Sequence, residues 1–229
     1  PGFRVELTNE EFLAQIKKVK AAISSQSPNL TPADAKFYAL RDVTATVDNK
    51  SLICASVVSK KIASGATSIV LDVKYGSGAF LKTKKEAEEL GDLMVRTAKL
   101  LNKDIDIVIS SMDCPLGKCI GNSLEVIEAI EFLKGNYETD LYETTKELAI
   151  KTILNCKKAP DSKTASKLFD EVIKNKTALN KLKEIIEAQK GDTRVIDDYS
   201  FLPMGKNKTQ IKSEKQGVIK IRGGGGKHG

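Results

Sequence analysis

A strand, a helix and a second strand follow one another in the middle of the chain, and this order constrains the fold most. Residues 67–74 form a short apolar run typical of a strand buried on both faces. A helix follows, and Thr83 and Glu86 have the spacing of a capping box at its start. Residues 105–109 form the next apolar run. Because strands joined through a helix lie parallel in one sheet, the pattern predicts an α/β fold with a mainly parallel sheet.

Most of the remaining chain shows the apolar spacing of helices. Two helix starts are explicit in the sequence. Thr8 and Glu11 form another capping box, and Pro32 follows Thr31 at the position that proline favours in the first turn. The predicted helices span residues 9–23, a segment from residue 31 onward, a segment capped by Asn122 that ends at Lys134-Gly135, and residues 141–154, 165–174 and 178–190.

A glycine-containing loop, Gly76-Ser-Gly78, comes directly after the first predicted strand. Leu81 stands where a dinucleotide fingerprint needs its third glycine, which argues against a Rossmann cofactor site. The loop nevertheless lies at the strand end where open α/β sheets bind their ligands. Two roles are therefore open, a close turn that lets Phe80 pack or a contact with a ligand.

The 229-residue chain carries a net charge of +7, and its tail supplies most of that charge. Residues 204–229 hold seven Lys or Arg and one Glu, and seven minus one is +6. A basic tail can bind polyanions without sequence preference, but no aromatic side chain lies between these lysines to stack on bases. A solvated segment is favoured, and a non-catalytic polyanion-binding protein is the alternative function.

Hydropathy and cysteine spacing indicate the compartment. No apolar run approaches the roughly 20 residues of a membrane span, and the first residues lack a secretory signal pattern. Cys54, Cys114, Cys119 and Cys156 match no compact disulfide framework, so we expect free thiols and a cytoplasmic protein. The single histidine, His228, argues against a structural zinc site.

Four polar side chains stand out in the largely apolar segment 37–61. Ser56 and Lys60 are four residues apart, so on a helix they share one face and can address one ligand. Tyr38 and Arg41 lie on the preceding predicted helix. The simpler interpretation of these residues is a helical hairpin whose cations are solvated.

The run Tyr-Ala-Leu-Arg-Asp-Val-Thr-Ala-Thr-Val from Tyr38, followed by Ser59-Lys-Lys, resembles the signature of pyrimidine-nucleoside and thymidine phosphorylases. The resemblance implies a pentosyl-transferring glycosyltransferase. Such an enzyme catalyses reversible phosphorolysis of thymidine, uridine or deoxyuridine to the free base and ribose or deoxyribose 1-phosphate. The resemblance continues in order through Ile69-Val-Leu-Asp-Val-Lys, Gly76-Ser-Gly-Ala-Phe, Met112-Asp, Pro115-Leu-Gly, Gly121-Asn and Leu124-Glu-Val, and returns weakly near Leu202-Pro203.

The resemblance gives the four side chains roles at the base. Arg41 and Lys60 are expected to be catalytic, because cations near the base oxygens stabilise the negative charge that develops there. Ser56 is expected to pair with the ring amide edge, and Tyr38 to orient the base or pack beside it. The family's phosphate-binding loop, of Lys-His-Ser-Thr-Gly-Gly type, is expected upstream of this sequence. The phosphate ligands are therefore unknown, and the chain is expected to be roughly the middle half of such an enzyme.

A monovalent cation, usually potassium, is also implied by the resemblance. In the family it is bound by main-chain oxygens of a loop and by a glutamate on the following helix. These positions fall on Leu116, Cys119 and Glu128. From the residues alone, a loop rich in free carbonyls that faces a carboxylate could hold a hard cation, whereas Glu128 by itself is more simply a surface acid.

The resemblance further implies a small all-helical domain beside a larger α/β domain, with the site in the cleft between them. The expected partners are a pyrimidine nucleoside and phosphate, with no membrane and no specific nucleic acid. Family members are generally homodimers through the helical domain, so we expect a homodimer. The expected division is residues 1–32 in the α/β domain, 33–63 in the helical domain, 64–203 in the α/β domain, and 204–229 as a basic linker that starts a C-terminal β-rich domain.

Overall fold

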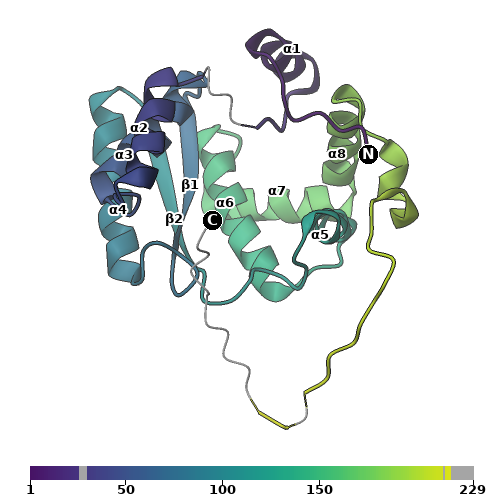
Figure 1. Ribbon diagram of the computed structural model, residues 1–229. Coiled ribbons are helices and arrows are strands. Elements are labelled where there is room, and N and C mark those ends of the chain that lie inside the picture. Colours follow the sequence, from purple (N-terminus) through teal and green to yellow (C-terminus); the bar gives the residue numbers. More distant parts are fainter. Residues whose placement is uncertain (26–29, 214, 218–229) are drawn as a thin grey trace. The chain divides into compact units, whose positions relative to one another are not determined.

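The computed structural model describes residues 1–25, 30–213 and 215–217 (Figure 1). Within these ranges the chain forms two compact units. The first unit contains residues 1–25, 117–138 and the described chain from residue 170 onward, and the second contains residues 30–116 and 139–169. The domain boundaries expected from the resemblance are different ones and stay a prediction.

The second unit is built on a two-stranded parallel sheet within the described residues. Strand β1 (Ser68–Tyr75) pairs with strand β2 (Asp104–Ser111) in parallel, from Ser68 opposite Asp104 to Tyr75 opposite Ser111. Helix α4 (Lys84–Leu100) makes the crossover between them. The predicted order of strand, helix and parallel strand is confirmed.

Local sequence explains why α4 starts and packs as it does. The Thr83 side chain accepts a hydrogen bond from the Glu86 amide at 3.2 Å, and the Glu86 carboxylate accepts one from the Thr83 amide at 3.0 Å. These two bonds form the predicted capping box, and the backbone donors hold the pKa of Glu86 below its usual value. The apolar stripe of the helix is buried against the sheet, at Ala87, Leu90, Met94 and Ala98.

Helices cover both faces of this sheet (Figure 1). Helix α3 (Lys50–Ala63) packs on α4, and helix α2 (Pro32–Val43) packs on α3. Helix α6 (Thr139–Asn155) contacts both strands from the opposite side. The result is a layered α/β unit whose core includes Cys54 and Val58 of α3.

The regular secondary structure in the described part of the first unit is helical. It contains α1 (Asn9–Val19), α5 (Asn122–Lys134), α8 (Thr177–Ala188) and the end of α7 (Ser162–Lys174). Two short 3-10 helices, η1 (Thr193–Ile196) and η2 (Tyr199–Phe201), follow α8. Its core consists of Ile130, Ile186, Val195, Ile196 and Leu202.

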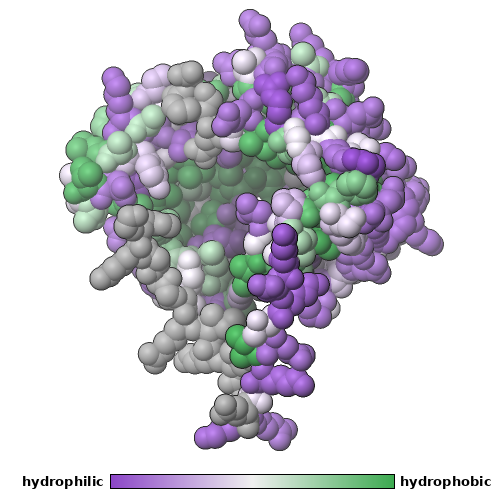
Figure 2. Space-filling view, turned by 45° about the vertical axis from the view of Figure 1, so that its right-hand side comes forward, coloured by the Kyte–Doolittle hydropathy of each residue, from purple (hydrophilic) through white to green (hydrophobic). Residues whose placement is uncertain are grey.

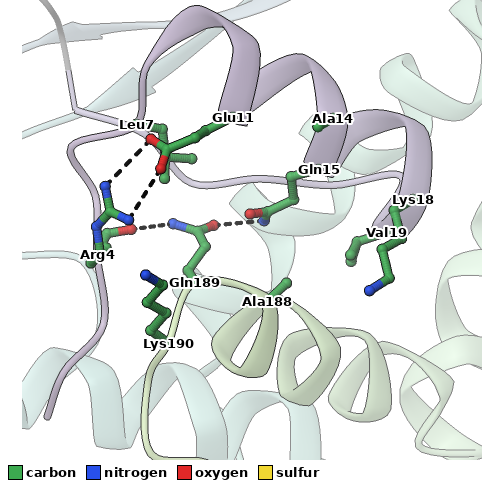
Figure 3. Close-up of a pocket in the computed structure, with 10 residues that line it drawn as sticks. All are labelled: Arg4, Leu7, Glu11, Ala14, Gln15, Lys18, Val19, Ala188, Gln189 and Lys190. Carbon is green, nitrogen blue, oxygen red and sulfur yellow. Dashed lines mark hydrogen bonds and ion pairs between the residues drawn. The ribbon is translucent and has the colours of Figure 1, made fainter.

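A buried amide ties the N-terminal segment of the first unit to the end of α8. Gln189 is 1% exposed, and its side chain donates to the main-chain oxygens of Arg4 and Ile23, at 2.5 and 2.7 Å. Its oxygen accepts from the Gln15 side chain and the Ile23 amide, at 2.9 and 3.0 Å. Figure 3 shows the bonds of Gln189 to Arg4 and Gln15 beside a cavity of about 280 Å³, where Arg4 also pairs with Glu11. We call these groups the Gln189 cluster.

Several predicted helix ends are wrong by a few residues. Helix α1 ends at Val19 rather than residue 23, because Lys20 adopts a left-handed conformation (φ 69°) and closes the helix. Helix α5 is capped by Gly121, not Asn122, and the Glu125 carboxylate accepts from the Gly121 amide at 2.9 Å. The Thr31 side chain makes no capping bond at the start of α2. Helix α8 ends at Ala188, two residues before the predicted end at residue 190, whereas α5 ends at Lys134 before Gly135 as predicted.

The chain after Pro203 is exposed along residues 203–213 and forms no strand there or at residues 215–217. Ile211, expected in a short β-like segment, is 92% exposed, and hydrophilic side chains dominate this extension in the lower part of Figure 2. The expected Val218-Ile-Lys-Ile segment, the glycine run from Gly223 and His228 lie outside the described residues, so the C-terminal β-rich domain stays a prediction.

Two further expectations concern single features of the described chain. All four cysteines are free thiols, and Cys54 is buried in the core of the second unit. Across residues 1–25, 30–213 and 215–217, no helix is long and apolar enough to cross a bilayer.

Candidate functional site

The four side chains expected at the base come together in the second unit. Tyr38 and Arg41 project from α2, and Ser56 and Lys60 project from α3. The Arg41 guanidinium carbon lies 5.3 Å from the centre of the Tyr38 ring, and the Lys60 ammonium lies 5.5 Å from it. With Asp34, which contacts Lys60, we call these residues the α2–α3 cluster.

Arg41 is a buried cation that holds the connection between the two helices. It is 5% exposed, and its guanidinium donates to the main-chain oxygens of Val47 and Leu52, the latter at 3.3 Å. Its Nε–H has no hydrogen-bond partner among the described residues. A buried donor without a partner is costly, so this N–H marks a place where a ligand acceptor would be stabilising.

Lys60 links α3 to α2 through polar contacts. Its ammonium donates to Ser56 Oγ at 3.1 Å, so the predicted sharing of one helix face is confirmed. Its nitrogen also lies 3.0 Å from Asp34 Oδ2. That oxygen has no well-directed hydrogen bond within the described residues, so the contact is an ion pair rather than an aligned hydrogen bond.

Asp34 was missed by sequence reasoning. It stands in the first turn of α2, where an acid is explained by the helix dipole alone. Its side chain is only 11% exposed, however, and that of Lys60 is 21% exposed. The only signal in the sequence was the acid itself, because the lysine that meets it belongs to the next helix.

A pocket of about 690 Å³ is lined on one side by Ile53 and Val57 of α3. Lys60 follows them at i+7 on the helix, but the pocket lining does not include Lys60 or the other residues of the α2–α3 cluster. The end of β1, the following loop with Phe80, and part of α4 contribute to the other walls. Phe80 is 67% exposed, so it does not pack into the core as one of the two expected roles required.

A side chain from the end of β2 holds the loop that carries Phe80. The Asp113 carboxylate accepts a hydrogen bond from the Ser77 amide at 2.8 Å, and this donor lowers the pKa of Asp113. The Gly78 amide donates to the Met112 main-chain oxygen at 3.0 Å. The loop is thus fixed at the carboxyl ends of the two parallel strands, the edge where such sheets bind ligands.

The residues expected to bind a cation include a carboxylate turned toward a loop of the first unit. Glu128 on α5 accepts hydrogen bonds from the Lys118 amide at 2.7 Å and the Cys119 amide at 3.4 Å. Burial raises the pKa of the Cys119 thiol, and the charge of Glu128 raises it further. Leu116 belongs to the second unit and stays a predicted ligand.

Gly117 leaves the space that this carboxylate occupies. A Cβ at Gly117 would lie 2.5 Å from Glu128 Oε2, and the backbone there has φ +73°. The carboxylate is an oxygen ligand of the kind that a hard cation prefers, whereas the loop groups that contact it here are the Lys118 and Cys119 amides. The described residues hold no group of three or more His, Cys, Asp or Glu suited to a metal, so any such site would depend on main-chain oxygens.

The parallel βαβ unit and the polar helix pair beside it lie within the part of the chain that one protein-family model matches. A sequence model described as "Glycosyl transferase family, a/b domain" matches residues 1–179, and the chain belongs to this family. Similar proteins carry a more particular name. They include pyrimidine-nucleoside phosphorylases of Bacillus subtilis (strain 168), 46% identical over 218 residues, and of Geobacillus stearothermophilus, 44% identical over 219 residues.

These alignments cover nearly all of this chain but only about half of each relative. They span 95% and 96% of the chain, against 50% and 51% of the two phosphorylases. The chain therefore spans about half the length of the curated relatives it matches. No comparison supports the alternative function, a polyanion-binding protein. Of the basic residues in the tail 204–229, the structure describes Lys206, Lys208, Lys212 and Lys215.

Proposed function

We propose that the whole protein containing this chain catalyses reversible phosphorolysis of pyrimidine nucleosides. The substrates would be thymidine, uridine or deoxyuridine, and the products the free base and ribose or deoxyribose 1-phosphate. The observation that carries the proposal is the α2–α3 cluster, in which Arg41, Ser56 and Lys60 gather within one polar site. The names of the relatives support the same reaction.

The cluster suits this chemistry because it offers donors where negative charge develops. When the bond from sugar to base breaks, the base retains the bonding electrons, and its oxygens become more negative. Arg41 has an unpartnered Nε–H. Ser56 Oγ already accepts from Lys60, so its own proton is free to be donated to a base oxygen. Arg41 and Lys60 supply positive charge, and Tyr38 packs beside the base.

The pocket next to α3 offers a place for the nucleoside itself. Its wall is apolar at Ile53 and Val57, which suits one face of a planar base. The phosphate co-substrate would bind to residues that we expect upstream of this sequence. The site would therefore be complete only in the whole protein.

We propose potassium, or another monovalent cation, as the cofactor. Its ligands would be main-chain oxygens of Leu116 and Cys119 together with the Glu128 carboxylate. A bound cation would supply positive charge that fixes the loop. The close approach of Glu128 to the loop amides supports the proposal, and an increase in melting temperature with potassium, absent in Glu128→Ala, would test it.

We also propose that the whole protein is a cytoplasmic homodimer. Helix α2 exposes an apolar stripe of Phe37, Leu40 and Val43, at 63%, 56% and 79%. Such a stripe is expected to be covered by another surface in the assembled protein. Sedimentation of the whole protein and of a Val43→Asp variant tests this, since the variant should shift the dimer toward monomer.

The activity is tested by release of free base from thymidine and uridine, with and without phosphate, by the whole protein and by this chain alone. We expect phosphate-dependent release by the whole protein. If the properly folded whole protein releases free base from neither nucleoside, the proposed function is refuted. Base release that does not need phosphate would indicate a hydrolase instead.

A further inference from the structure

We propose that Asp34 is a positioning residue that orients the Lys60 ammonium, and through it the Ser56 hydroxyl, toward the base. The inference rests on the proposed function, since it assigns Asp34 a part in the same site. It concerns a residue that neither the motif nor the helix pattern singles out.

Burial of the ion pair is the first argument. The Asp34 and Lys60 side chains are 11% and 21% exposed, and their charged atoms lie 3.0 Å apart. The Lys84–Glu88 pair on α4 is an ordinary surface pair, with 65% and 53% exposure and a distance of 4.0 Å. Removing charges from water is costly, so a half-buried lysine needs a nearby anion to keep its charge there.

The geometry of the ammonium group is the second argument. A lysine ammonium carries three N–H donors and no acceptor. One is directed to Ser56 Oγ at 3.1 Å, and the Asp34 carboxylate, 3.0 Å from the nitrogen, attracts the positive charge toward α2 without an aligned hydrogen bond. These two contacts restrain the ammonium at the end of a flexible side chain. The N–H donors that they do not use can then face a ligand, as pre-organised catalysis requires.

A simpler role for Asp34 is stabilisation of the α2 dipole from its first turn. That role needs no partner and no burial, because a solvated acid in the first turn interacts with the dipole as well. It also predicts an effect on stability that is independent of Lys60. The two roles therefore separate in a double-mutant cycle.

The experiment measures phosphorolysis of thymidine and uridine by the whole protein and its Asp34→Asn variant, which keeps the shape and removes the charge. We expect kcat/KM to fall about 10- to 100-fold, because a misdirected donor loses much of its effect in the transition state. Asp34→Glu, which restores the carboxylate, should recover activity to within about threefold of the natural protein.

The cycle adds Lys60→Met alone and together with Asp34→Asn. If Asp34 acts through Lys60, Asp34→Asn should change kcat/KM by less than about twofold in the Lys60→Met protein. Glu89→Gln is the matched control, because it breaks the exposed Lys50–Glu89 pair, also anchored on α3, at 2.5 Å. We expect its activity to be unchanged.

Equal losses from Asp34→Asn with and without Lys60 would overturn the positioning role and leave only a structural one. Full activity of Asp34→Asn would overturn it as well, while leaving the proposed function intact. A whole protein that is folded but releases no base with phosphate would refute the proposed function itself, and the role of Asp34 with it.

Discussion

Gln189 in the first unit and Arg41 in the second are both buried polar side chains, 1% and 5% exposed, but they differ in how completely they are bonded. The Gln189 amide makes four hydrogen bonds, two donated and two accepted. Arg41 donates to two carbonyls and keeps a buried Nε–H without a partner among the described residues.

The difference separates structural polar groups from functional ones. An amide with two N–H donors and two acceptor sites on its oxygen has no capacity left once four bonds are made. The Gln189 cluster can therefore stabilise the unit but can bind little else. In the α2–α3 cluster the Arg41 Nε–H remains unused among the described residues, and a buried group of this kind is expected to have a functional role or to bind a water, an ion or a ligand.

The largest expected effect is on catalysis, from Lys60→Ala. Removing one donor from a transition-state site typically costs about 10²- to 10³-fold in rate, so we expect that loss in kcat/KM for the whole protein. Lys61→Ala is the matched control, because it removes the neighbouring lysine, which is exposed. Steady-state kinetics with thymidine and uridine measure both variants. Near-normal turnover of Lys60→Ala would remove Lys60 from the site.

The second prediction concerns the Gln189 cluster and its contribution to the free energy of unfolding. Gln189→Leu removes the partner of the Arg4 and Ile23 main-chain oxygens and of the Ile23 amide, and leaves the Gln15 side chain with only the Ala21 oxygen. We expect the free energy of unfolding to fall by about 3 kcal/mol, from the desolvation of these groups. Denaturant titration measures it, with the exposed Gln210→Leu as control. Loss of activity in the folded variant, without loss of stability, would contradict the distinction between the two clusters.

The sequence predicts one of these clusters better than the other. Ser56 and Lys60 are four residues apart on one helix, so local spacing is enough to bring them together. The parallel strands follow from the same kind of local periodicity. Gln189, by contrast, meets Gln15 across 174 positions of the chain, and a single polar residue in a helix end carries no pattern that announces such a contact.

The ion pair between Asp34 and Lys60 lies between these cases. Each residue is explained locally, one by the helix dipole and the other by solvation. Only the packing of α2 on α3 shows that they meet. The helix ends were missed for a related reason, since a left-handed Lys20 replaced the glycine or asparagine expected at such a position.

The third prediction extends the comparison to a carboxylate that accepts from a loop. In Gly117→Ala the new Cβ would lie 2.5 Å from Glu128 Oε2, at a backbone φ of +73°. Gly65→Ala is the matched control, because φ is +81° there and no atom lies within 4 Å. We expect a loss of about 1 kcal/mol for Gly65→Ala from the left-handed backbone alone, and about 3 kcal/mol for Gly117→Ala. Thermal or denaturant unfolding measures the difference, and equal losses would show that Glu128 is free to move away.

The smallest effect on stability is expected at the ion pair of Asp192 and Arg194 on the surface of the first unit. The guanidinium of Arg194 donates to Asp192 at 2.7 and 3.0 Å, and these bonds, with the Arg194 amide, lower the pKa of Asp192 to about 2 from 3.8. A carboxyl whose folded-state pKa is depressed stabilises the fold above its unfolded pKa. That contribution is lost as the pH falls through the folded value.

The stabilising effect of Asp192 should therefore be complete above about pH 4 and disappear as the pH approaches about 2. Asp192→Asn should be slightly less stable than the natural protein at neutral pH, and the two should converge in acid. Denaturant midpoints measured at several pH values between these limits compare them. Because the pair is exposed, the difference should be well below that of Gln189→Leu, and high salt should reduce it further. A difference that persists unchanged into acid would mean that Asp192 acts through the shape of its turn, which asparagine does not reproduce, rather than through its charge.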